Sequence, residues 1–262
     1  MHSELKKSIK DGSVILFVGA GVSVTLGLPT WAQLVSKMSI DLGYDERLFT
    51  QYGDSLALAE FYEISKGRIG ELRSWMDSNW NIKKEAIKAS TIYESITKLN
   101  FPVIYTTNYD HFLETAFDVW EKPYKRVVDV DDFIGLDTKG TQIVKFHGDT
   151  ISVESIVLTE SSYFKRLEFE SPLDIKLRAD MLGKSILFIG YSLSDINIRL
   201  LLYKLNQLWA TSNTGNRPES YIFLPTPNPV QEAIFHKRGI TTIIGEKLDK
   251  TESMEAFLQG LL

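Results

Sequence analysis

The sequence predicts an α/β fold, a Rossmann-like parallel sheet with helices on both faces and a helical insertion after the first strand. Two observations favour it. Short apolar runs rich in β-branched and aromatic residues recur along the chain, and continuous apolar character is typical of strands buried on both faces. Segments with helical periodicity separate these runs. Strands that alternate with helices indicate right-handed crossovers and a parallel sheet.

The individual elements follow from these patterns. The expected core strands are Val14–Val18, Val103–Tyr105, Gln142–Phe146, Ser185–Ile189, Tyr221–Leu224 and Ile240–Ile244. A further strand, Lys125–Val130, is placed at an edge of the sheet. The helices expected between and after the later strands include Asp110–Trp120, Asp195–Trp209, Pro229–Lys237 and Ser253–Leu262.

The interval between the first two strands breaks this rhythm. It contains no good strand, and its periodic segments all read as helices: Trp31–Asp41, Ser55–Ser65, Arg68–Asn79 and Lys84–Lys98. We therefore expect a single domain over residues 1–262, with a helical module inserted at about 31–100. Such a module could cover the carboxyl edge of the sheet.

Composition narrows the range of functions. Hydrophobic residues make up 44% of the 262 residues, enough for a full core, and the net charge of −5 argues against wrapping a nucleic acid. The chain has no cysteine and its four histidines lack ligand spacing, so we expect no metal. A cytoplasmic location without membrane contact is expected, because no apolar run approaches the ~20 residues of a membrane span and the N-terminal segment lacks a signal peptide's apolar core.

The first candidate binding motif is a glycine turn. Gly19, Gly21 and Ser23 directly follow the first strand, where glycines permit a tight turn and close approach of backbone N–H groups to a pyrophosphate. The match to G-x-G-x-x-G is incomplete, because Val24 occupies the sixth position. An ordinary turn between a strand and a helix is the alternative interpretation.

Polar clusters follow two further strands. Asn108 and Asp110 come after the second core strand, and His147 follows the third. Ligands of open parallel sheets bind outside the carboxyl ends of strands, and the ordinary pKa of histidine suits a general base. The alternatives are structural: Asn108 as a turn residue, Asp110 as a helix N-cap, and His147 as a structural rather than a catalytic histidine.

The fourth motif repeats the pattern of strand, glycine and hydroxyl groups. Gly190 and Ser192 follow the fourth core strand, where the hydroxyl and local backbone N–H groups could bind ribose or phosphate. Ser194 or Asp195 is also a candidate N-cap for the next helix. Each motif alone is weak, whereas four strand ends with this chemistry are much less expected by chance.

In this order, GAGVS, TTNYD, KFHGD and GYSLSD resemble the sirtuin-like family of NAD-binding domains, and most closely its prokaryotic antiphage-defence branch, whose members hydrolyse NAD. The resemblance implies that Asn108 orders the ribose or the attacking water, that Asp110 lies near the nicotinamide amide, and that His147 is the base. It also implies a set of NAD-binding residues. The glycine turn would contact the pyrophosphate, and Gly190 and Ser192 would contact the adenosine side. The full set is Gly19, Ala20, Gly21, Ser23, Thr107, Gly190, Ser192 and Asp195.

The expected activity is hydrolysis of the nicotinamide–ribosyl bond of NAD, without a metal. The resemblance also implies a trigger, either homo-oligomerisation or a separate defence-system partner. Deacylation or ADP-ribosyl transfer, NAD or ADP-ribose sensing without turnover, and a purely structural role remain alternatives. The absence of cysteines and the sequence Pro29-Thr30-Trp31 depart from the protein-deacetylating sirtuins, which usually carry four zinc-binding cysteines.

Overall fold

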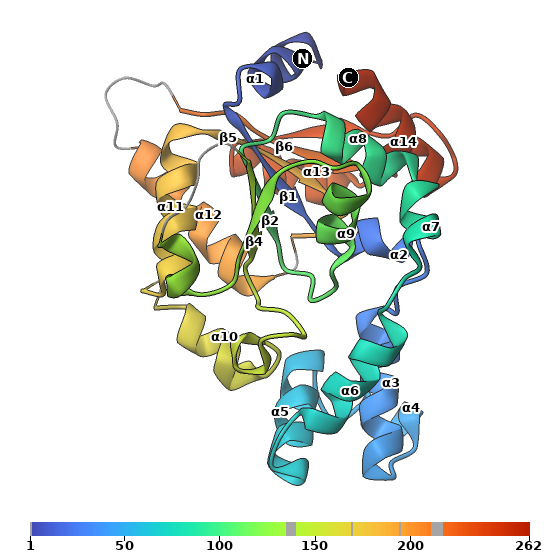
Figure 1. Cartoon of the computed structure of the whole chain (residues 1–262). Helices are drawn as coiled ribbons and strands as arrows, with labels where there is room; N and C mark the ends of the chain where they lie inside the picture. Colours follow the sequence, from blue (N-terminus) through green and yellow to red (C-terminus); the bar gives the residue numbers. More distant parts are fainter. Residues whose placement is uncertain (1, 135–139, 169, 194, 211–216) are drawn as a thin grey trace.

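The computed structural model describes residues 2–134, 140–168, 170–193, 195–210 and 217–262. Its centre is a seven-stranded sheet with the order β3-β4-β2-β1-β5-β6-β7, and every neighbouring pair of strands is parallel (Figure 1). The predicted Rossmann-like parallel sheet is therefore confirmed.

Each predicted strand is present. The strands are β1 (Val14–Val18), β2 (Val103–Thr106), β3 (Tyr124–Val127), β4 (Thr141–Lys145), β5 (Ser185–Ile189), β6 (Ser220–Leu224) and β7 (Ile240–Ile244). The edge strand β3 ends three residues before the predicted end at Val130. The Asp132 carboxylate accepts hydrogen bonds from the N–H groups of Val128 and Asp129. Asp132 belongs to a short 3₁₀ helix, Val130–Phe133, so these N–H groups bond to that helix and not to a neighbouring strand.

Two hydrophobic layers cover the sheet, as the alternation of side chains along a strand requires. Leu16 of β1 faces one layer and Phe17 faces the other. The first layer is built from α1 (His2–Lys10), α2 (Ala20–Val24), α7 (Lys84–Lys88), α8 (Thr91–Lys98), α9 (Phe112–Val119) and α14 (Lys250–Leu261). The second is built from α11 (Pro172–Gly183), α12 (Ile196–Ala210) and α13 (Pro229–Lys237).

A helical module lies beyond the sheet, at the lower right of Figure 1. It consists of α3 (Trp31–Leu42), α4 (Glu46–Phe49), α5 (Ser55–Lys66) and α6 (Gly70–Asn79). Its hydrophobic cluster is separate from the two sheet layers, and Tyr109, Ile156 and Leu158, which follow β2 and β4, complete it. Thr30 starts α3 with a capping box that includes Gln33.

The interval predicted as one insertion, 31–100, thus contains two groups of helices. α7 and α8 pack on the sheet, where Ile87, Ile92 and Ile96 are fully buried. The single helix predicted over Lys84–Lys98 is interrupted at Ser90, whose hydroxyl caps α8. The chain also forms α10 (Glu160–Arg166) and a 3₁₀ helix, Val153–Ser155, which no clear pattern in the sequence indicates. In the described ranges no helix has the length and apolar character needed to cross a membrane.

The central strands predict where stability is concentrated. Leu187 of β5 is fully buried in the first layer, whereas Leu248 is fully exposed. We expect Leu187→Ala to lower the free energy of unfolding by about 2–5 kcal/mol, because it leaves a cavity between packed layers. Leu248→Ala, the matched control, should change it little. Urea denaturation measures both, and equal effects would contradict this core assignment.

Candidate functional site

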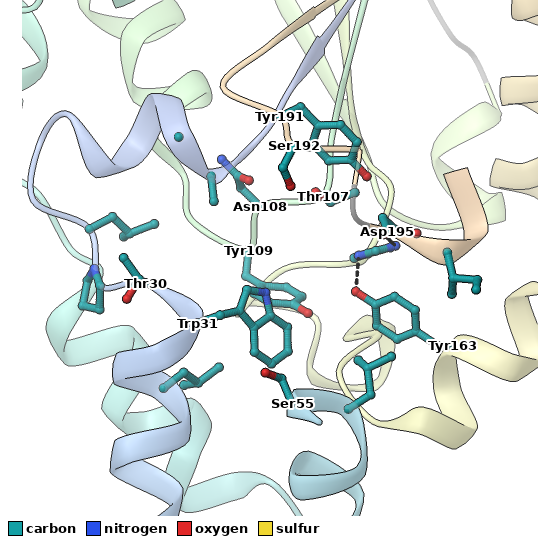
Figure 2. A pocket seen from close by; sticks show the side chains of 18 of the residues that line it. Thr30, Trp31, Ser55, Thr107, Asn108, Tyr109, Tyr163, Tyr191, Ser192 and Asp195 are labelled. Atoms are coloured by element: carbon teal, nitrogen blue, oxygen red, sulfur yellow. Dashed lines mark hydrogen bonds and ion pairs between the residues drawn. The ribbon is translucent and has the colours of Figure 1, made fainter. Parts of the chain in front are cut away.

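The four sequence motifs converge at one edge of the sheet. They follow β1, β2, β4 and β5, which are adjacent strands in the order β4-β2-β1-β5. A pocket of about 790 Å³ opens at their carboxyl ends (Figure 2). Most of the predicted site residues line it: Ala20, Gly21, Thr107, Asn108, His147, Gly190, Ser192 and Asp195. Gly19, Ser23 and Asp110 are outside the lining; Ser23 bonds directly to Asn108, and Asp110 bonds to Ser23.

Glycines join the loops after β1 and β5. The Gly21 N–H donates to the Gly190 carbonyl oxygen at 2.9 Å. A Cβ on Gly19 would lie 2.4 Å from the same oxygen, and a Cβ on Gly190, whose φ is +57°, would lie 2.5 Å from the Val22 nitrogen. The glycines are thus required by loop-to-loop packing. The Gly21 N–H is used in this contact, and pyrophosphate binding at the turn stays a prediction.

A hydrogen-bond chain fixes the side chain of Asn108. Its Nδ2 donates to Ser23 Oγ at 3.1 Å, and Ser23 Oγ donates to Asp110 Oδ2 at 2.9 Å. A carboxylate only accepts, so Ser23 donates to Asp110 and its oxygen accepts from the amide of Asn108. This order leaves the Asn108 Oδ1, an acceptor, outside the chain.

Asp110 supports this chain from outside the pocket. Its Oδ1 accepts the Phe112 N–H at 3.0 Å, so it satisfies one N–H at the start of α9, which begins two residues later than predicted. Burial raises the pKa of Asp110, while the Lys145 charge opposes the increase. Both oxygens are engaged, and the expected contact with a nicotinamide amide stays a prediction.

A buried lysine in the KFHGD motif was assigned no role from the sequence. Lys145 is fully buried; its Nζ donates to the Asp110 carbonyl oxygen and lies 3.5 Å from Glu114 Oε1. Burial opposes the ionisation of Glu114, but Lys145 and His111 outweigh it and lower the pKa of Glu114 to about 2. A lysine inside a buried apolar strand is a signal for such a charge pair, because an unpaired buried ammonium is very costly.

His147 lies between a tyrosine and a carboxylate. Its Nδ1 is 3.3 Å from the Tyr163 hydroxyl, and its Nε2 is 3.2 Å from Asp195 Oδ2 without hydrogen-bond alignment. Burial lowers the pKa of His147 to about 4; Asp195 and Asp174 partly oppose this effect and Arg166 adds to it. The imidazole is therefore neutral at neutral pH.

Asp195 has two contacts, of which the sequence suggested one. Its Oδ1 accepts the N–H groups of Asn197 and Ile198 and thereby caps α12, while its Oδ2 faces His147. Ser194, the other candidate cap, lies outside the described residues. The sequence shows Asp195 only as an acidic residue before a helix, and this pattern does not indicate a contact with His147 in the loop after β4.

The far wall of the pocket comes from helices whose contribution the sequence did not reveal. Trp31 of α3, Ser55 of α5 and Tyr163 of α10 line it (Figure 2). In the sequence, Trp31 resembles an ordinary core residue after a rigid turn, and nothing distinguishes Tyr163 from other aromatic residues. Within the described part of the chain, no three His, Asp or Glu side chains are grouped to hold a metal.

The low pKa of His147 predicts a pH dependence of stability. Between the ordinary pKa of 6.5 and the folded value of about 4, the unfolded chain binds a proton that the folded chain does not. The free energy of unfolding therefore falls as the pH falls through this window. In His147→Gln this contribution is absent, so its free energy of unfolding should fall less between neutral pH and about pH 5. Urea denaturation measures both slopes, and equal slopes would contradict a buried neutral imidazole.

Comparison with known proteins identifies the family of the chain. The model of the SIR2-like domain family matches residues 102–243, more than half of the chain. The NAD(+) hydrolase ThsA of Enterococcus faecium is 29% identical over 202 residues, covering 75% of this chain and 40% of the relative. Defense-associated sirtuin 2 of Bacillus subtilis is 26% identical over 236 residues, covering 87% and 22%.

A second ThsA, from Cytobacillus dafuensis, is 28% identical over 207 residues and covers 78% of this chain. The chain spans 40% of the length of both these ThsA proteins and 22% of the defence-associated sirtuin. The matched segment contains Asn108, His147 and Ser192, three of the residues that line the pocket. The chain therefore belongs to the SIR2-like domain family, which implies NAD binding, and its relatives include NAD(+) hydrolases and a defence-associated sirtuin.

Proposed function

We propose that this domain is an NAD+ glycohydrolase, which cleaves the nicotinamide–ribosyl bond to give nicotinamide and ADP-ribose and depletes NAD during antiphage defence. One observation carries the proposal: Asn108 and His147, which follow neighbouring strands, both line a single pocket whose lining also includes aromatic residues of the helices. The names of the relatives support the same reaction. The volume of about 790 Å³ is within the usual range for ligand pockets.

The proposed chemistry makes modest demands on the protein. The nicotinamide of NAD is already a cationic leaving group, so the reaction needs a held ribose, a desolvated pyridinium and a positioned water. Asn108 supplies an acceptor whose orientation Ser23 and Asp110 fix. Trp31 and Tyr163 supply apolar surface that excludes bulk water.

His147 is proposed to take the proton of the attacking water. With a pKa of about 4 it is a weak base, but water that attacks an oxocarbenium-like centre becomes acidic as the bond forms, so a weak base suffices. Because the imidazole stays neutral well below its ordinary pKa of 6.5, the contribution of His147 is retained in mildly acidic solution.

NAD-dependent transfer to another acceptor is the main alternative. Deacylation and ADP-ribosyl transfer begin with the same bond cleavage, but the chain has no cysteine for the zinc site usual in protein-deacetylating sirtuins. A sensing role without turnover would need NAD binding alone. The resemblance of the four motifs to the antiphage-defence branch is the basis for proposing a trigger, by self-association or by a partner.

The catalytic pair can be tested by alanine substitution. Asn108→Ala and His147→Ala should each remove most nicotinamide release; loss of general-base assistance alone is worth about 10²–10⁴-fold. The matched controls are Asn206→Ala on α12 and His236→Ala on α13, both outside the pocket lining, and they should retain wild-type rates.

The assay measures nicotinamide and ADP-ribose from NAD, with purified protein and in cells in which the defence response is triggered, and circular dichroism controls for folding. Folded Asn108→Ala and His147→Ala proteins that hydrolyse NAD at the wild-type rate would show that this pair is not catalytic. A wild-type protein that binds NAD but releases no nicotinamide under any condition would favour sensing.

Acceptor specificity gives a separate prediction. With acetyl-lysine peptide present, the products from NAD should remain nicotinamide and free ADP-ribose, with little deacetylated peptide, because water is the proposed acceptor. Mass spectrometry of the peptide and chromatography of the nucleotides measure both. Robust NAD-dependent deacetylation would replace hydrolysis with acyl transfer as the activity.

A further inference from the structure

We propose that Asp195 is a positioning residue that fixes the tautomer of His147 by holding the ring proton on Nε2 and leaving Nδ1 as the basic atom. This inference deepens the proposed function and, for its catalytic part, rests on it. It starts from the location of a fully buried imidazole between two polar groups that come from different helices.

Asp195 decides the tautomer because a carboxylate can only accept. Its Oδ2 lies 3.2 Å from His147 Nε2, and both side chains are buried, with exposed fractions of 8% and 2%. A bare Nε2 lone pair would repel the carboxylate oxygen, whereas an Nε2–H is attracted to it. Nε2 has no aligned hydrogen bond in the described residues, to Asp195 or to any other group, and the Asp195 carboxylate, 3.2 Å away, is the acceptor for that proton.

Tyr163 completes the arrangement without determining it. A phenol hydroxyl can donate or accept, so its 3.3 Å contact with Nδ1 fits either tautomer. With the proton on Nε2, the Tyr163 hydroxyl donates to the Nδ1 lone pair. Tyr163 points into the pocket (Figure 2), so an attacking water reaches Nδ1 by taking the place of this hydroxyl.

The resulting step is balanced. The bond from ribose to the nicotinamide nitrogen breaks, and its electron pair leaves with nicotinamide. The water oxygen bonds to the ribose carbon, and one water proton moves to His147 Nδ1. The imidazolium then carries protons on both nitrogens, and the adjacent Asp195 carboxylate stabilises its charge.

The two oxygens of Asp195 allow the proposal to be separated from folding. Oδ1 caps α12, and an asparagine side chain can make the same cap. Asp195→Asn therefore preserves the helix start and changes only what faces His147. Asp249→Asn is the matched control, because Asp249 caps α14 through the N–H groups of Thr251 and Glu252, outside the pocket.

The deciding measurement is NMR of histidine labelled with ¹⁵N, which distinguishes the two neutral tautomers. At neutral pH we expect Nε2–H for His147 in the wild type, in Tyr163→Phe and in Asp249→Asn. In Asp195→Asn the new amide N–H donates to Nε2, so the proton should move to Nδ1 and be donated to the Tyr163 oxygen. A wild-type Nδ1–H, or an unchanged tautomer in Asp195→Asn, would overturn the proposal.

Kinetics provides the functional readout. Asp195→Asn should lower kcat for nicotinamide release by roughly 100-fold or more with KM little changed, as expected when the base is in the wrong tautomer. Asp249→Asn should match the wild type. A wild-type kcat in Asp195→Asn with a switched tautomer would overturn the catalytic role. If the wild type releases no nicotinamide, the proposed function fails, while the NMR result still decides the tautomer.

Discussion

A single backbone hydrogen bond, from the Gly21 N–H to the Gly190 carbonyl oxygen, underlies the arrangement of the pocket. It joins the loops after the two central strands so closely that a Cβ at Gly19 or Gly190 would overlap backbone atoms. Ser23, just beyond the first loop, holds Asn108. Asp195, just beyond the second, faces His147. Both candidate catalytic side chains thus depend on the same contact between glycines.

Buried polar groups behind this contact are accommodated in two opposite ways. Lys145 and Glu114 form a buried charge pair, and removing one partner of such a pair typically costs about 3–5 kcal/mol. His147 instead stays neutral, because burial lowers its pKa more than Asp195 raises it. Both groups are positioned by strand β4, because Lys145 is its last residue and His147 follows two positions later.

The strands of the sheet could be predicted from the sequence because strands buried on both faces consist of uninterrupted apolar runs, as at Val14–Val18 and Ser185–Ile189. The convergence of Asn108 and His147 followed from parallel topology alone. Other features depend on tertiary contacts that leave no local pattern. The low pKa of His147 arises from burial by distant segments, and Tyr163 comes from a short helix without a distinct apolar period. Asp195 was explained so well as a helix cap that its second contact was missed.

The helical module contributes to the pocket in two ways. Trp31 lines it directly, and Tyr109, the residue after Asn108, is packed in the module's hydrophobic cluster, where its ring stacks on Trp80 and its hydroxyl donates to the Val157 carbonyl oxygen at 2.6 Å. The backbone beside Asn108 is therefore anchored in the module as well as in the sheet. A shortened chain in which a tight turn replaced α3–α6 would keep both sheet layers yet lose that anchor, so the smallest fragment that folds and the smallest fragment that retains the site are different lengths of polypeptide.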